Sequence, residues 1–243
     1  MSRHRLTFIA AIGAGLLAAG ALTGCATAAS TQGSTPASSS TPDAEGTASA
    51  DSIQVGWLEG GAAIALVTLG SSSCPPVVEG EPSVEGTTLT VVLADSPRTT
   101  CTRDMAPRAT VVSVPTGVDP TAGLAVRVTG AAEGAAMLPG LAAASASPEQ
   151  FTSSAGWVGR DLLAVLTYGS SGCPPVVESV TTAGSELSVQ FATPPADRIC
   201  TMDLAPRVTV ADVTGVAGPD VTSVALSGGG VEAPEPIAIL GSR

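Results

Sequence analysis

The chain contains one pattern twice, and this internal repeat limits the folds that are open to it. Cys74–Glu79 (CPPVVE) is followed by Cys101–Arg108 (CTRDMAPR), and Cys173–Glu178 (CPPVVE) is followed by Cys200–Arg207 (CTMDLAPR). The two cysteines are 27 positions apart in each copy. Because the same residues return at the same spacing, we expect two similar structural units, each with its own cross-link.

Both copies show the alternation of apolar and polar residues that is typical of β-strands. In Leu187–Phe191 (LSVQF), for example, the apolar residues alternate with Ser188 and Gln190. Short segments of this kind, separated by Gly, Pro or Asp, recur about seven times in each copy, without an amphipathic, capped helix. The sequence therefore predicts an all-β fold made of two tandem small antiparallel β-sandwich or barrel domains, each with one disulfide.

We expect the two domains at 52–142 and 151–243, with a linker at 143–150. Trp57 and Trp157 occupy matching positions near the start of each copy. Only 2% of the residues are aromatic, so each Trp is expected to fill the core of its domain. The alternative is an exposed aromatic side chain that binds a sugar or peptide.

The four cysteines of the repeats are expected to pair within each copy, Cys74 with Cys101 and Cys173 with Cys200. In the chain-entropy model, closing such a loop stabilises the folded state by roughly 3.5 kcal/mol, which matters in a domain with a small core. A zinc site is the alternative for four cysteines. Its usual C-x-x-C pairs and histidines are absent from both copies.

The first 25 residues have the features of an export signal. Arg3 and Arg5 precede an uncharged apolar run at 6–22, which is followed by Thr23, Gly24 and Cys25. Leu22–Cys25 (LTGC) resembles the lipobox of bacterial lipoproteins at all four positions. This resemblance covers the signal region only. It implies cleavage of a signal peptide at 1–24, attachment of a palmitate-type lipid to Cys25, and a location on the extracytoplasmic face of the cell membrane.

Two further observations concern the same region. Five cysteines are present and four pair in the repeats, which leaves Cys25 for the lipid; an ordinary signal peptide followed by an unrelated cysteine is the alternative. The next segment, 25–51, consists almost entirely of Ala, Ser, Thr, Gly and Pro. We expect it to be a disordered tether of about 25–30 Å.

The charge of the chain excludes one class of partner. All 21 acidic residues follow Cys25, whereas Arg3 and Arg5 precede it, so the formal charge from Cys25 onward is −13, two units below that of the whole chain (−11). Such a surface repels the phosphates of nucleic acids and anionic lipids. We expect no nucleic-acid partner; the expected partners are the membrane, through the lipid, and another envelope protein.

The side chains needed for most catalytic mechanisms are missing after Cys25. The chain has no lysine, and its only histidine is His4, which removes the common nucleophile–base pairs. A two-carboxylate glycan hydrolase that uses Glu79 or Glu178 remains formally open, although such sites normally have aromatic side chains around them. We expect no enzymatic activity, no cofactor and no metal site.

Three charged residues recur in both copies: Glu79, Asp104 and Arg108 match Glu178, Asp203 and Arg207. In one interpretation they are structural: each Asp accepts backbone N–H groups in a turn before Ala-Pro, and each Arg pairs with a carboxylate on a neighbouring strand. In the other they form a polar recognition patch for a peptide or a cation. The predicted function is a non-catalytic binding or structural lipoprotein of the envelope. The alternatives are an accessory subunit of an envelope enzyme or transporter, and a cell-wall glycan hydrolase.

Overall fold

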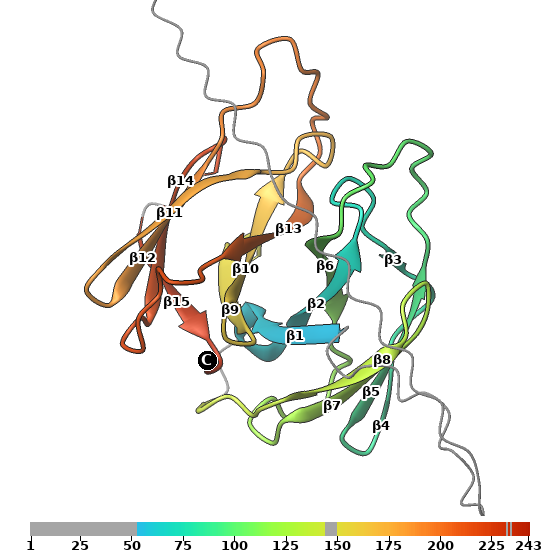
Figure 1. Ribbon diagram of the computed structural model, residues 1–243. Coiled ribbons are helices and arrows are strands. Elements are labelled where there is room, and N and C mark those ends of the chain that lie inside the picture. Colours follow the sequence, from blue (N-terminus) through green and yellow to red (C-terminus); the bar gives the residue numbers. More distant parts are fainter. Residues whose placement is uncertain (1–52, 144–149, 232, 234) are drawn as a thin grey trace, which may run out of the picture. The chain divides into compact units, whose positions relative to one another are not determined.

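The computed structural model describes residues 53–143, 150–231, 233 and 235–243 (Figure 1). The predicted signal peptide and tether, including Cys25, and most of the predicted linker lie outside the described residues. The part that is described contains fifteen β-strands and one short 3-10 turn. Within it, no helix has both the length and the apolar character that crossing a membrane requires. The all-β class is therefore confirmed.

The first repeat forms two sheets (blue to green in Figure 1). One is a three-stranded antiparallel sheet in the order β1-β2-β6, and the other has the order β3-β5-β7-β8, with β4 also paired to β5. The elements are β1 (Ile53–Leu58), η2 (Glu59–Gly61), β2 (Ala63–Gly70), β3 (Val77–Val78), β4 (Ser83–Glu85), β5 (Thr88–Ala94), β6 (Ala106–Ser113), β7 (Leu124–Gly130) and β8 (Gly134–Leu138).

The second repeat uses equivalent strands in the same sequence (yellow to red in Figure 1). They form one sheet in the order β11-β12-β14-β15-β9-β10-β13, because β15 pairs with β9. The strands are β9 (Ser154–Val158), β10 (Leu162–Gly169), β11 (Val177–Ala183), β12 (Glu186–Phe191), β13 (Ala205–Asp212), β14 (Ser223–Gly228) and β15 (Ile237–Leu240).

The prediction of purely antiparallel sheets is wrong. β5 pairs with β7 in parallel, β12 with β14 in parallel, and β15 with β9 in parallel. In the first repeat the cause is the chain path: the chain leaves β5 for β6, which lies in the other sheet, and then returns to β7 in the same direction as β5. A hairpin cannot produce this arrangement, since a parallel pair needs a crossover connection.

Each repeat has its own apolar core. In the first repeat, alternate residues of β5 and β7, such as Leu89, Val91 and Val126, are buried together with Trp57. The equivalent core of the second repeat includes Trp157. Both tryptophans thus belong to the core, as the first of the two interpretations predicts, and the Nε1 of Trp57 donates to the carbonyl oxygen of Pro139 at 2.7 Å.

A third buried cluster contains residues of both repeats. It consists of Leu58, Ala63, Ala65, Val67, Ala109, Val158, Ala164 and Leu166. It exists because β2 (AIALVTLG) and β10 (LLAVLTYG) are apolar on both faces: one face covers the core of the repeat and the other contacts the neighbouring repeat. The expected pair of self-contained sandwich or barrel domains is therefore not present in that form. The repeats stack on each other, as the units of a solenoid do.

The backbones of β1 and β9 approach each other closely at a pair of glycines. A Cβ atom on Gly56 would overlap with the carbonyl oxygen of Trp157, and one on Gly156 would overlap with that of Trp57. The Gly-Trp pair of each repeat thus fits against that of the other. Only glycine allows this separation, which explains why it precedes Trp in both copies.

Two hydrogen bonds to Glu59 also join the repeats. Its backbone N–H donates to Ser154 Oγ at 2.8 Å, and its carboxylate accepts from the hydroxyl of Tyr168. Glu59 has a φ of 49°, which is costly for a residue with a side chain, and both bonds help to hold it there. Phe151 packs edge-on against Tyr168, with ring centroids 5.5 Å apart.

Candidate functional site

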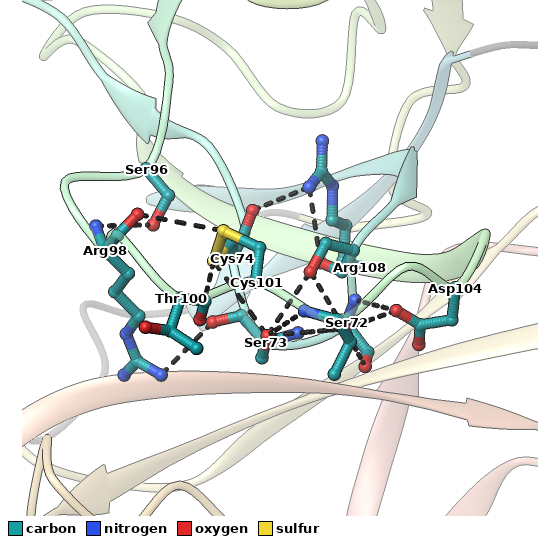
Figure 2. Close-up of a disulfide and its surroundings, with 11 residues drawn as sticks. Ser72, Ser73, Cys74, Ser96, Arg98, Thr100, Cys101, Asp104 and Arg108 are labelled. Carbon is teal, nitrogen blue, oxygen red and sulfur yellow. Dashed lines mark hydrogen bonds between the residues drawn. A yellow bond between two sulfur atoms is a disulfide. The ribbon is translucent and has the colours of Figure 1, made fainter.

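In each repeat a disulfide fastens two loops to each other, and this pair of loops is called the stapled loops below. The first loop follows β2 or β10, and the second precedes β6 or β13. The bonds are Cys74–Cys101 and Cys173–Cys200, with Cα–Cα distances of 5.5 and 5.4 Å. Both predicted pairings are confirmed. They bring the recurring Asp and Arg residues to one place in each repeat. Figure 2 shows this arrangement in the first repeat.

The two aspartates fasten the stapled loops by hydrogen bonds. Asp104 accepts from the backbone N–H of Ser72 at 3.1 Å and from the hydroxyl of Thr102. Asp203 accepts in the same way from Ser171, at 2.9 Å, and from Thr201. The backbone donor thus comes from the opposite loop, whereas the prediction expected a local turn.

These hydrogen bonds stabilise the ionised form of each carboxyl group. The bonds from Ser72 and then Thr102 hold the pKa of Asp104 well below its usual range, and Ser171 and Thr201 have the same effect on the pKa of Asp203. A carboxylate with such a low pKa is a poor proton acceptor near neutral pH.

Among the described residues, neither of the two recurring arginines forms the ion pair with a carboxylate that the structural interpretation of the sequence predicts. Arg108 Nη1 donates to the carbonyl oxygen of Cys74 at 2.6 Å, and Arg207 Nη1 donates to that of Cys173 at 3.1 Å. Arg207 Nη2 also donates to the carbonyl oxygen of Tyr168 at 3.1 Å. Each guanidinium thus supports the backbone on which the disulfide is built.

A glycine at the end of the preceding strand makes room for each guanidinium. Gly70 and Gly169 both have a φ of +155°, and a Cβ atom on either would overlap with the guanidinium of Arg108 or Arg207. Burial lowers the pKa of Arg207, although the negative charge of Asp203 opposes this effect. Its Nε is buried without a hydrogen-bond partner among the described residues.

The two glutamates are not part of this arrangement. Glu178 lies on β11 and accepts from Gln190 on β12 at 3.2 Å. The backbone N–H of Glu79, just after β3, donates to Val92. Among the described residues, neither carboxylate bonds to an Asp or Arg of the predicted patch. The residues of the predicted patch therefore do not form one group. The Asp and Arg residues bond to the stapled loops, whereas the Glu residues lie apart from them.

Several apolar side chains of the stapled loops are largely exposed, a feature that the residue pattern did not predict. Met105 is 75% exposed in the first repeat, and Ile199 and Met202 are 93% and 105% exposed in the second. Leu204, which matches Met105 in the repeat, is also exposed. The sequence does contain an indication of this exposure. In both copies an apolar residue directly follows the recurring Asp, within loops whose other residues are mostly polar.

A hollow of about 280 Å³ lies beside the Cys74–Cys101 bond. Arg98 and Arg108 are among its lining residues, with Asp95 and Pro76. Arg98 also donates to the carbonyl oxygen of Ser73 at 3.2 Å, and Arg198 donates to that of Gly172 at 2.9 Å in the second repeat. The described residues contain no group of three or more His, Cys, Asp or Glu side chains that could hold a metal ion.

Comparison of the chain with protein families, with curated proteins and with solved structures finds no significant match.

Proposed function

We propose that the protein is a lipid-anchored lipoprotein on the extracytoplasmic face of the cell membrane, and that it binds another envelope protein without catalysing a reaction. The anchor would be a lipid on Cys25, and the tether would carry the two repeats away from the membrane. In this proposal the two repeats, packed against each other through their shared cluster, are displayed together.

One observation carries the binding proposal: large apolar side chains are exposed on loops that are fastened by a disulfide and by hydrogen bonds. Full burial of a large apolar side chain contributes about 1.5–3 kcal/mol of favourable free energy, and this applies to each of Met105, Ile199 and Met202. The loops that carry them are fastened by a disulfide and by the Asp and Arg bonds. A rigid loop loses little conformational entropy on binding, so more of that gain remains as affinity.

The charges around the stapled loops of the second repeat also indicate what kind of partner could bind there. The stapled loops of the second repeat contain Asp197, Arg198 and Asp203, and Arg207 on β13 bonds to the loop backbone at Cys173. Together these four side chains have no net formal charge. They lie in a chain that is strongly acidic overall. Burying these loops against an apolar, uncharged partner surface would therefore leave little unpaired charge out of water.

The test uses two methionines that are equally exposed in different places. Met105, beside the disulfide, is 75% exposed, and Met137, on β8, is 74% exposed. Membrane proteins would be cross-linked to the wild type, to Met105→Asp and to Met137→Asp, with Met202→Asp as a second loop variant. We expect one defined partner to be retained by Met137→Asp and lost by both loop variants. Equal capture by all four proteins would refute binding through the stapled loops.

The anchor has a separate test. Cells that express the wild type should incorporate labelled palmitate into the protein, whereas Cys25→Ala should carry no label and should leave the membrane fraction. Label on Cys25→Ala would refute the assignment of the anchor. If the captured partner is a subunit of an enzyme or transporter, the protein is an accessory subunit, which is the second candidate function.

A further inference from the structure

The outermost strand at one sheet edge differs between the two repeats. In the first repeat this edge consists of two short pieces, β3 and β4, and the residues between them include Gly80 and Pro82. In the second repeat it is one continuous strand, β11. The edge is thus interrupted in one copy and complete in the other, although the strands beside it, β5 and β12, are equivalent.

The register identifies which residue makes the difference. Ser83 pairs with Thr90 in the first repeat, and Thr181 pairs with Ser188, the equivalent position, in the second. Pro82 therefore occupies the place of Val180. Proline has no N–H to donate, and natural sheets use it to protect exposed edges. The second repeat lacks this protection.

The edge of β11 is open along Ser179–Ala183. On one side β11 pairs with β12, and no other described strand pairs with it. The register is irregular only between Val177 and Ser179 and is regular from there to Ala183. Thr181 is exposed, whereas Val180 is half-buried against the core. The N–H and C=O groups on the outer side of this run thus have no partner strand among the described residues.

We infer that Ser179–Ala183 is an interface at which two copies of this chain pair edge to edge, antiparallel and centred on Thr181. The run is self-complementary in that register. Thr181 would face Thr181 of the second copy, and Val180 would face Thr182. Threonine pairs and pairs that contain a β-branched residue are favourable across antiparallel strands. A contact of this type uses the same surface twice and closes as a dimer.

The distribution of charge supports a second copy of the chain as the partner that binds at this edge. The five residues contain no charged side chain, although the chain has 21 acidic residues. The acids nearest to it in the sequence are Glu178 and Glu186, and neither lies within the paired run. Two copies can therefore pair here without placing like charges opposite each other, which would weaken the contact. This inference does not depend on the stapled loops or on the lipid anchor.

The first experiment introduces a cysteine at the centre of the predicted contact. The described strands and both disulfides all lie in one compact unit. Directly opposed residues of antiparallel strands have Cα atoms about 4.5–5.5 Å apart, which is within the range of a disulfide. Thr181→Cys should therefore form a covalent dimer on mild oxidation. The control is Thr129→Cys, an exposed threonine on β7, and it should remain monomeric.

The second experiment introduces into the edge strand of the second repeat the proline that interrupts the edge of the first repeat. Val180→Pro places in β11 the residue that the first repeat has at the same position, and it should abolish concentration-dependent dimers in sedimentation equilibrium. Thr181→Lys is the second variant, in case proline disturbs the fold, which circular dichroism would reveal. A wild type that stays monomeric at all concentrations, equal cross-linking of the two cysteine variants, or dimers that persist in both edge variants would overturn the inference.

Discussion

The shared cluster predicts that damage in one repeat lowers the stability of the other. Leu166, on β10 in the second repeat, is fully buried (0% exposed) in that cluster. Replacing a buried leucine by alanine costs about 2–5 kcal/mol, since apolar contacts are lost and a cavity remains. With a urea m value of about 2–3 kcal/mol per molar, the unfolding midpoint of Leu166→Ala should fall by about 1–2 M.

Each repeat has one tryptophan, so each can be observed separately. In a Trp157→Phe background, the remaining Trp57 reports unfolding of the first repeat by fluorescence. We expect Leu166→Ala to lower the midpoint seen by Trp57, although Leu166 belongs to the other repeat. Leu69→Ala is the control, because Leu69 is 51% exposed on β2. An unchanged Trp57 transition in Leu166→Ala would mean that the repeats unfold independently, and the reasoning from the shared cluster would fail.

Three further predictions concern separate features. Replacing both Cys173 and Cys200 by Ser should lower the free energy of unfolding by about 2–5 kcal/mol, measured by urea denaturation; a loss below about 1 kcal/mol would contradict the role assigned to the staple. Gly156→Ala should destabilise strongly, since its Cβ would overlap with a backbone oxygen of the other repeat; a melting temperature equal to that of the wild type would show that the backbones can separate at no cost. Burial and the hydrogen bond to Glu59 raise the pKa of Tyr168 to about 12 from its usual 10.0, so the stability gained from the neutral hydroxyl is complete below pH 10 and lost as pH rises through about 12. Tyr168 is the only tyrosine, so ultraviolet titration of tyrosinate should show one midpoint near 12 in the folded protein; a midpoint near 10 would refute this.

Residue patterns predicted the local features well. The alternation in Leu187–Phe191 indicated a half-buried strand, and this segment lies within β12, where Leu187 is fully buried. The equal spacing of cysteines in both copies indicated pairing within each repeat. These predictions succeed because each depends on a short segment or on a relation that the duplication repeats.

Relations between distant segments were harder to predict. Alternation shows which side of a strand is buried but not whether its neighbour is parallel, so the β5–β7 pairing was missed. The apolar run of β2 was visible in the sequence, and a strand without alternation indicates burial on both faces. Its second face was not recognised as a contact with the other repeat. The carbonyl partners of Arg108 could not be foreseen, because they depend on how two loops meet.

The Gly-Trp contact between β1 and β9 has a consequence for the history of the chain. Gly56 meets Trp157 as Gly156 meets Trp57, which is the reciprocal contact that two identical chains make about a two-fold axis. An ancestor with a single repeat would already have carried both halves of it. Once the two copies were joined in one chain, they no longer had to remain alike. The hydrogen bond between Tyr168 and Glu59 is an example of such a difference between the copies. Gly159 matches Glu59 and Leu69 matches Tyr168, and these two residues cannot form the equivalent side-chain hydrogen bond.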